Sequence, residues 1–95
     1  MRIQTISDFR TAMRRGPYAW PGGYPCYFLL SDGEALSFNA AKQERRSILE
    51  ALRDYQTDKR ERSGWRPIAL EINYEDSELF CAHTGERIET AYTDD

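Results

Sequence analysis

Residues 16–25 contain three glycines and three prolines within ten positions. Proline has no backbone N–H to donate and glycine adds conformational freedom, so neither a helix nor a central strand runs through such a stretch. The chain must therefore place one short element before residue 16 and all its other elements after residue 25. We expect residues 16–25 to form a loop, which is long for a connection in a domain of 95 residues.

The same loop carries three aromatic residues, Tyr18, Trp20 and Tyr24. One interpretation is that the loop folds back and its rings cover the core. The other is that the rings form an exposed recognition surface, because Tyr and Trp supply a large contact area at a low cost in side-chain entropy. The sequence leaves both interpretations open.

Local patterns predict the first elements on either side of the loop. Apolar residues at helical spacing predict a helix over 7–15, with Ser7 as its N-cap. After the loop, the apolar run 26–30 predicts a buried strand, and residues 35–38 predict a second strand. The Asp32-Gly33 pair between them is typical of a hairpin turn. The two strands are therefore expected to form a hairpin.

A second helix and a second hairpin are predicted further along the chain. The helix spans 40–56 with Asn39 as its cap, and its apolar face consists of Ala41, Ile48, Leu52 and Tyr55, widened by Leu49 and Ala51. Alternating apolar residues predict a half-buried strand over 68–74, and a turn leads to another strand over 78–82. The element order is then helix, hairpin, helix, hairpin.

The remaining segments carry weaker signals. Residues 56–64 contain no apolar side chain, so they form either an exposed helix end or a solvated loop. Ile88 and Tyr92 are expected to pack on the core, and residues 93–95 to fray. Together these patterns predict one domain over 1–95 of the α+β class, with a small antiparallel sheet of two hairpins and two helices on one face (order α-β-β-α-β-β).

The charge is unevenly distributed. The net charge is −3, but residues 1–15 and 42–66 each carry +3, whereas residues 71–95 carry −7. Such segregation reflects either solvated faces or a partner with a charged surface, and three exposed cations of the second helix, Arg45, Arg46 and Arg53, are candidate contacts. A protein that reads duplex nucleic acid is usually net basic, so the overall sign argues against that role.

Other compositional features exclude whole classes of protein. No run approaches the roughly 20 apolar residues of a membrane span, and the first residues lack the apolar core of a signal peptide. We therefore expect a cytoplasmic protein with reduced thiols and no membrane partner. Two cysteines, Cys26 and Cys81, and one histidine, His83, are too few for a structural zinc site. No metal or cofactor is expected.

Cys81 and His83 would point to the same face of a strand, where an acid such as Glu86 or Glu89 could complete a catalytic group. That combination arises easily by chance, and each thiol is more often a small core residue. We therefore do not expect an enzyme.

Several segments together resemble a group of small uncharacterised proteins encoded on bacterial plasmids, integrative elements and phages. These segments are Gly-Gly-Tyr-Pro (22–25), Tyr-Phe-Leu (27–29), Asp32-Gly33, Asn73-Tyr74-Glu75-Asp76 and the run from His83 to Tyr92. Some members carry two Cys-x-x-Cys knuckles like those of a zinc ribbon. The matching positions here are Ser37, Ala40, Cys81 and Thr84, so three of the four ligands are absent. The resemblance then implies that packing by Leu36, Phe38, Phe80 and Ile88 replaces the metal.

Two functions follow as expectations. The resemblance to mobile-element accessory proteins implies a noncatalytic binding protein, an inhibitor or adaptor of a host or element-encoded protein. The alternative is a nucleic-acid-binding protein derived from a zinc ribbon that has lost its metal, with arginines on phosphates and aromatic rings on bases. The candidate binding residues are Tyr18, Trp20, Tyr24, Arg45, Arg46 and Arg53.

Overall fold

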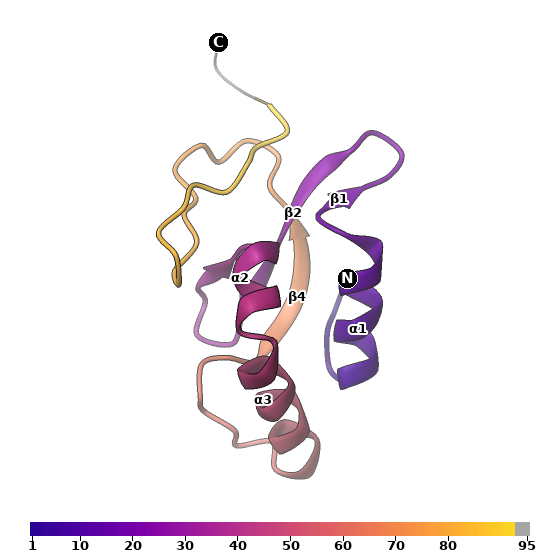
Figure 1. Cartoon of the computed structure of the whole chain (residues 1–95), viewed down its shortest axis with the longest axis vertical. Helices are drawn as coiled ribbons and strands as arrows, with labels where there is room; N and C mark the ends of the chain where they lie inside the picture. Colours follow the sequence, from indigo (N-terminus) through magenta and orange to yellow (C-terminus); the bar gives the residue numbers. More distant parts are fainter. Residues whose placement is uncertain (93–95) are drawn as a thin grey trace.

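The computed structural model describes residues 1–92. Within this range the chain forms three helices and a small antiparallel sheet of four strands, which confirms the predicted α+β class (Figure 1). The elements, in chain order, are α1 (Ile6–Arg15), β1 (Tyr18–Ala19), β2 (Tyr24–Leu30), β3 (Ala35–Leu36), α2 (Phe38–Gln43), α3 (Arg45–Thr57) and β4 (Pro67–Ile72). None of these helices is long and apolar enough to cross a membrane.

Strand β2 is the centre of the sheet. It pairs antiparallel with β1, β3 and β4, and Phe28 lies opposite both Leu36 of β3 and Leu70 of β4. Alternate β2 side chains, Cys26, Phe28 and Leu30, are buried, as expected for a strand with one face against the core. The hairpin predicted around Asp32-Gly33 is confirmed, although its second strand is short.

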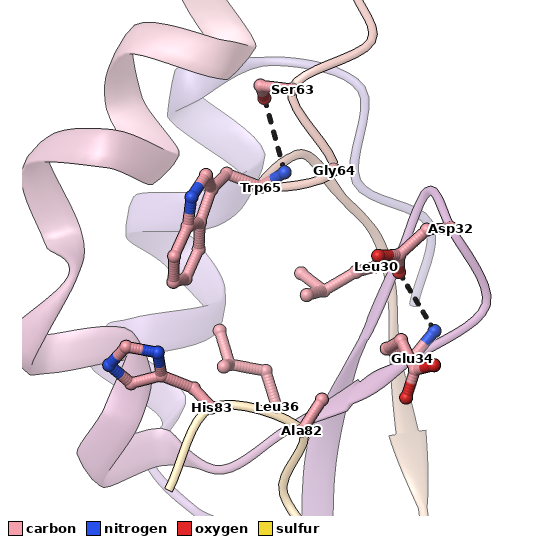
Figure 2. Close-up of a pocket in the computed structure, with 9 residues that line it drawn as sticks. All are labelled: Leu30, Asp32, Glu34, Leu36, Ser63, Gly64, Trp65, Ala82 and His83. Atoms are coloured by element: carbon pink, nitrogen blue, oxygen red, sulfur yellow. Dashed lines mark hydrogen bonds between the residues drawn. The ribbon is translucent and has the colours of Figure 1, made fainter.

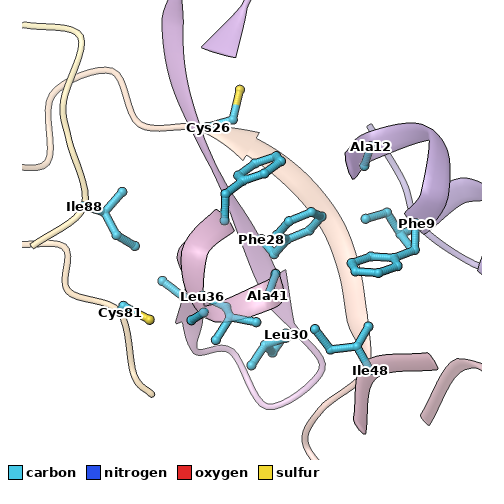
Figure 3. Close-up of a cluster of buried hydrophobic side chains, with 14 of the residues drawn as sticks. Phe9, Ala12, Cys26, Phe28, Leu30, Leu36, Ala41, Ile48, Cys81 and Ile88 are labelled. Atoms are coloured by element: carbon cyan, nitrogen blue, oxygen red, sulfur yellow. The ribbon is translucent and has the colours of Figure 1, made fainter. Parts of the chain in front are cut away.

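The helices pack on the face of the sheet that Phe28 presents (Figure 3). The Phe28 ring lies 5.4 Å from that of Phe9 on α1 and 4.7 Å from that of Phe38 on α2, measured between ring centroids. Ile48 and Leu52 of α3 are also fully buried. Burying one such side chain contributes about 1.5–3 kcal/mol, so this cluster is the main source of stability.

Helix α1 begins at its own capping box. The Thr5 hydroxyl accepts a hydrogen bond from the Asp8 N–H, and the Asp8 carboxylate accepts one from the Thr5 N–H. Hydrogen bonds from the Gln4 and Thr5 N–H groups lower the pKa of Asp8. The N-cap is therefore Thr5, and the prediction of Ser7 is wrong by two positions.

The predicted single helix over 40–56 is two helices, with a break at Glu44. Ser37, not Asn39, is the N-cap, because its hydroxyl accepts the Ala40 N–H at 3.1 Å. The sequence carries a trace of the break, since residues 42–47 are all polar and interrupt the apolar stripe. At the break, Glu44 has φ −103° and ψ 22°, and the helices on both sides of it bury apolar residues.

The second predicted hairpin is wrong. Residues 78–82 do not form a strand, and β4 pairs with β2 instead, through residues 26–30. Among the described residues, the expected strand takes part in one isolated bridge, between Phe80 and Arg87. Phe80 is 48% exposed, so it does not replace a metal by packing, whereas Leu36, Phe38 and Ile88 are buried. The backbone hydrogen-bonding groups of β4 are paired with β2, which is adjacent to β4 in space but not in sequence.

The prediction of a loop over 16–25 is also wrong in part. Tyr18 and Ala19 pair with Pro25 and Tyr24, so the segment is a small hairpin. Its prolines are tolerated because Pro17 and Pro25 use only their carbonyl groups, which accept from Cys26 and Asn73.

The last described residues run back beside the segment that follows β4, with hydrogen bonds from the Ile88, Ala91 and Tyr92 N–H groups to the carbonyls of Leu79, Asn73 and Tyr74. Ile88 is buried as expected, but Tyr92 is 57% exposed, which contradicts the prediction that it packs on the core. Residues 93–95, expected to fray, lie outside the described part of the chain.

Candidate functional site

Among residues 1–92, the most exposed large hydrophobic side chain lies on the β1–β2 hairpin. Trp20 is 76% exposed, and Tyr18 is also exposed, so the recognition-surface interpretation of these rings fits the structure better than a core lid. Both side chains line one shallow hollow with Arg15 and Leu70. The hairpin lies at one end of the long axis of the molecule (Figure 1).

Two glycines shape the tip of this hairpin. Gly23 has φ +67°, and a Cβ there would lie 3.2 Å from the Trp20 ring. Gly22 has φ +109°, and a Cβ there would lie 2.7 Å from the Tyr24 ring. Side chains rarely adopt these backbone angles, so both positions require glycine. The Trp20 and Tyr24 rings thus lie against the glycine backbone of the tip, although most of the Trp20 side chain is exposed.

Tyr24 is half-buried and packs against two further tyrosines that the sequence did not single out as a surface. Its ring centroid lies 5.7 Å from that of Tyr74, which is 49% exposed, and the Tyr92 N–H donates to the Tyr74 carbonyl. Interaction with the Tyr24 hydroxyl raises the pKa of Tyr92. Tyr74 was predicted as an inward residue of a strand, but β4 ends at Ile72.

We call the rings of Tyr18, Trp20, Tyr24, Tyr74 and Tyr92 the aromatic end. Acidic groups accompany it: the Tyr18 hydroxyl donates to the Glu89 carboxylate at 2.7 Å, and this hydrogen bond raises the pKa of Tyr18. The aromatic end therefore combines large apolar area with hydroxyl groups and carboxylates. Such a surface suits contact with a protein.

The three candidate arginines lie elsewhere. They are exposed on α3, which occupies the opposite end of the molecule from the hairpin (Figure 1). Arg46 approaches Glu50 at 3.9 Å across one helical turn, an exposed pair that contributes little stability. Arg45 faces a hollow beside α1. The six predicted binding residues therefore do not form one site.

The region of the absent knuckles is brought together around Cys81. The Ser37 N–H donates to the Cys81 sulfur at 3.4 Å. Burial raises the pKa of the Cys81 thiol, but hydrogen bonds from Ser37 and Thr84 outweigh it and lower the pKa to about 7. Cys26, in contrast, has its pKa raised by burial. No group of three or more metal-binding side chains exists among residues 1–92, so the residues present do not fit a metal.

His83 lies beside a small pocket of about 210 Å³ (Figure 2). Its Nε2 atom is 3.0 Å from Glu44, and its ring meets Trp65 edge-on at 5.3 Å between centroids. Leu30 and Leu36 form an apolar wall of the pocket. The rest of its lining consists of Asp32, Glu34, Ser63, Gly64 and Ala82. Cys81 does not line the pocket, so the structure does not bring the predicted Cys–His pair to a common cavity.

Comparison of the chain with protein-family models, with curated proteins and with solved structures finds no match. Three regions are therefore interpreted from their own chemistry: the aromatic end, the surroundings of Cys81, and the hollow beside α1.

Proposed function

We propose that this chain is a noncatalytic binding protein that contacts another protein through its aromatic end. The observation that carries the proposal is the exposure of Trp20 on a hairpin whose tip holds the ring in place. Trp and Tyr are the residues most often responsible for binding energy at protein interfaces, and a ring held in place loses little entropy on binding.

The setting proposed for this activity is the bacterial cytoplasm, with a host protein or a protein of a mobile element as the partner. The resemblance of segments 22–25, 73–76 and 83–92 to mobile-element proteins supports it. The arrangement of Ser37, Cys81 and Thr84 around one sulfur atom is also what a lost metal site would leave behind.

Nucleic-acid binding is the second candidate. It is favoured by four cations, Arg10, Arg14, Lys42 and Arg45, that line one hollow. It is disfavoured at the aromatic end, because carboxylates such as Glu89 would repel the phosphates of a strand whose bases stacked on the rings.

The test is capture of partners from a bacterial lysate with the immobilised chain, with and without nuclease, followed by affinity measurements on the purified partner. A protein that survives nuclease should bind Trp20→Ala at least about tenfold more weakly, as expected for a central aromatic contact. Phe80→Ala is the matched control, because Phe80 is an exposed ring outside the aromatic end.

Equal binding of the wild type and of the double variant Trp20→Ala/Tyr74→Ala would refute the aromatic end as the interface. Recovery of nucleic acid, with every protein lost on nuclease treatment, would replace the first proposal with the second. Amide NMR spectra of each variant establish that the fold is intact.

A further inference from the structure

Helix α1 contacts α3 at its first residue and borders a hollow further along its length. At its first residue the Ile6 N–H donates to the Gln56 side chain of α3 at 3.1 Å. Towards its C-terminal half, a hollow of about 400 Å³ separates α1 from the α2–α3 junction. This hollow is lined by Phe9, Arg10, Met13, Arg14, Lys42 and Arg45. Four of the six lining residues are cations, and none is an acid.

No carboxylate among residues 1–92 forms an ion pair with these cations. Within residues 1–92, none of the four takes part in an ion pair, and the only recorded side-chain bond of this set joins Arg14 to the Thr11 hydroxyl at 3.3 Å. Gathering four like charges at one hollow opposes folding through mutual repulsion. Their arrangement therefore creates a local positive potential in a protein whose net charge is −3.

A second hollow continues the first along α1. The two share Met13 and Lys42, and the second extends past Phe38 to Tyr18 and Ile88 at the hairpin. Its outer lining is of mixed charge, with Glu86, Arg87 and Glu89. A groove thus runs along the C-terminal half of α1, with a cationic end, an apolar lining from Met13 and Phe38, and a mixed far end.

We propose that this groove docks an acidic, amphipathic segment of a partner protein. The four cations provide charge complementarity for carboxylates, and Met13, which is half-buried, offers contact to apolar side chains on the same segment. A nucleic-acid strand fits less well, because it carries a phosphate at every nucleotide and would pass some of them by Glu86 and Glu89 at the far end, whereas a peptide can confine its carboxylates to the cationic end. The cationic end of the groove contains no residue of the aromatic end, whereas the far end of the groove shares Tyr18 with it.

The experiment uses the full chain and three labelled probes. The first is a 16-residue amphipathic peptide with Glu on one face and Leu on the other, the second has Gln in place of every Glu, and the third is a single-stranded 16-nucleotide DNA. Fluorescence anisotropy gives the affinity of each, and amide NMR shifts locate the contact. The acidic peptide should shift signals of α1 and α2 around Met13 and Lys42, and should bind more weakly as salt rises.

The double variant Arg14→Glu/Arg45→Glu should weaken binding of the acidic peptide by about tenfold or more, since each reversal replaces an attraction by a repulsion. Arg2→Glu/Arg62→Glu is the matched control, because it changes the net charge equally at exposed positions outside the groove. The proposal would be overturned by any of four results: equal weakening by both variants, NMR shifts that lie outside the groove, absence of binding of the acidic peptide, or equal binding of the Gln peptide. Tighter binding of the DNA at the same residues would assign the groove to nucleic acid instead.

Discussion

Asn73 is a buried amide that joins the C-terminal segment to the end of β4. It is 4% exposed, its Nδ2 group donates to the carbonyls of Asp76 and Glu89, and its Oδ1 atom accepts from the Asp76 N–H. The backbone of Asn73 also accepts from the Ala91 N–H. One side chain therefore satisfies backbone groups of both a turn and a distant segment.

Asn73→Ala should lower the free energy of unfolding by about 2 kcal/mol, because buried backbone groups lose their partners. Urea denaturation followed by circular dichroism measures the loss. Asn39→Ala is the control, since Asn39 is exposed on α2 and should change stability by less than about 0.5 kcal/mol. A cost of similar size for both variants would contradict the assigned role of Asn73.

Cys81 should titrate near neutral pH. The pKa of its thiol is lowered from 9.0 to about 7, whereas that of Cys26 is raised. In the Cys26→Ser variant, which keeps Cys81, the ultraviolet absorbance of the thiolate should show a titration midpoint near pH 7. In the Cys81→Ser variant, which keeps Cys26, the thiolate absorbance should reach its full value only above pH 9.

The lowered pKa also predicts how stability depends on pH. Because the folded thiol loses its proton more readily than the unfolded one, its contribution is fully present above about pH 9 and is lost as the pH falls towards about 7. Unfolding of the wild type should become less favourable from pH 7 to 9 relative to Cys81→Ser. Parallel pH profiles of the two proteins would contradict the assignment.

The elements differ in how well local sequence predicted them. Helix α1 and the hairpin of β2 and β3 follow from apolar spacing and a turn signal, and both signals lie within the element. The strand expected at 78–82 failed because Phe80 and Leu79 look like strand residues locally, while β4 had already found its partner in β2. Tyr18, Trp20 and Tyr24 were predicted as candidates because they lie close together in one segment of the sequence. Tyr74 and Tyr92 were not predicted, because their exposure depends on where β4 ends.

Ser37, directly before α2, lies against Cys81, so this region is where an engineered metal site would test the proposed descent from knuckle proteins. The substitutions Ser37→Cys, Ala40→Cys and Thr84→Cys, combined with the native Cys81, should create a four-thiolate site for Zn²⁺. Co²⁺ should then give the absorption bands of tetrahedral coordination, and Zn²⁺ should raise the melting temperature.

The same triple variant carrying Cys81→Ser is the control for metal binding, and it should bind Zn²⁺ far more weakly. A folded triple variant whose melting temperature ignores Zn²⁺ would argue against descent from a knuckle protein.

At the scale of the whole molecule, the proposed aromatic binding surface and most of the buried core occupy different regions. Most of the core lies where α1, α2 and α3 meet β2 and β4, and the C-terminal segment contributes only Cys81 and Ile88 to its buried residues. The hairpin of the aromatic end lies at one end of the 46 Å long axis (Figure 1). The C-terminal segment is held by a small number of backbone hydrogen bonds and by Asn73, without a continuous ladder. Its opening is therefore expected to cost less than global unfolding.

Hydrogen exchange should reveal this difference. Amides of β2 and β4, such as those of Phe28 and Leu70, should exchange only through global unfolding, while those of residues 74–92 should exchange faster. Asn73→Ala should accelerate the exchange of residues 74–92 much more than the exchange of the β2 and β4 amides, once the exchange rates are corrected to equal global stability. Uniform exchange across both groups would mean that the molecule opens as a single unit.

The amino-acid sequence by itself determined the α+β class, the helix before residue 16, the hairpin around Asp32-Gly33 and the burial of Ile48 and Leu52. Each depends on spacing or turn chemistry between residues close in the chain. Only the tertiary structure decided which strand pairs with β4, which rings stay exposed and which cations share a groove. Those outcomes depend on contacts between distant segments, and local patterns carry no record of which distant partner provides them.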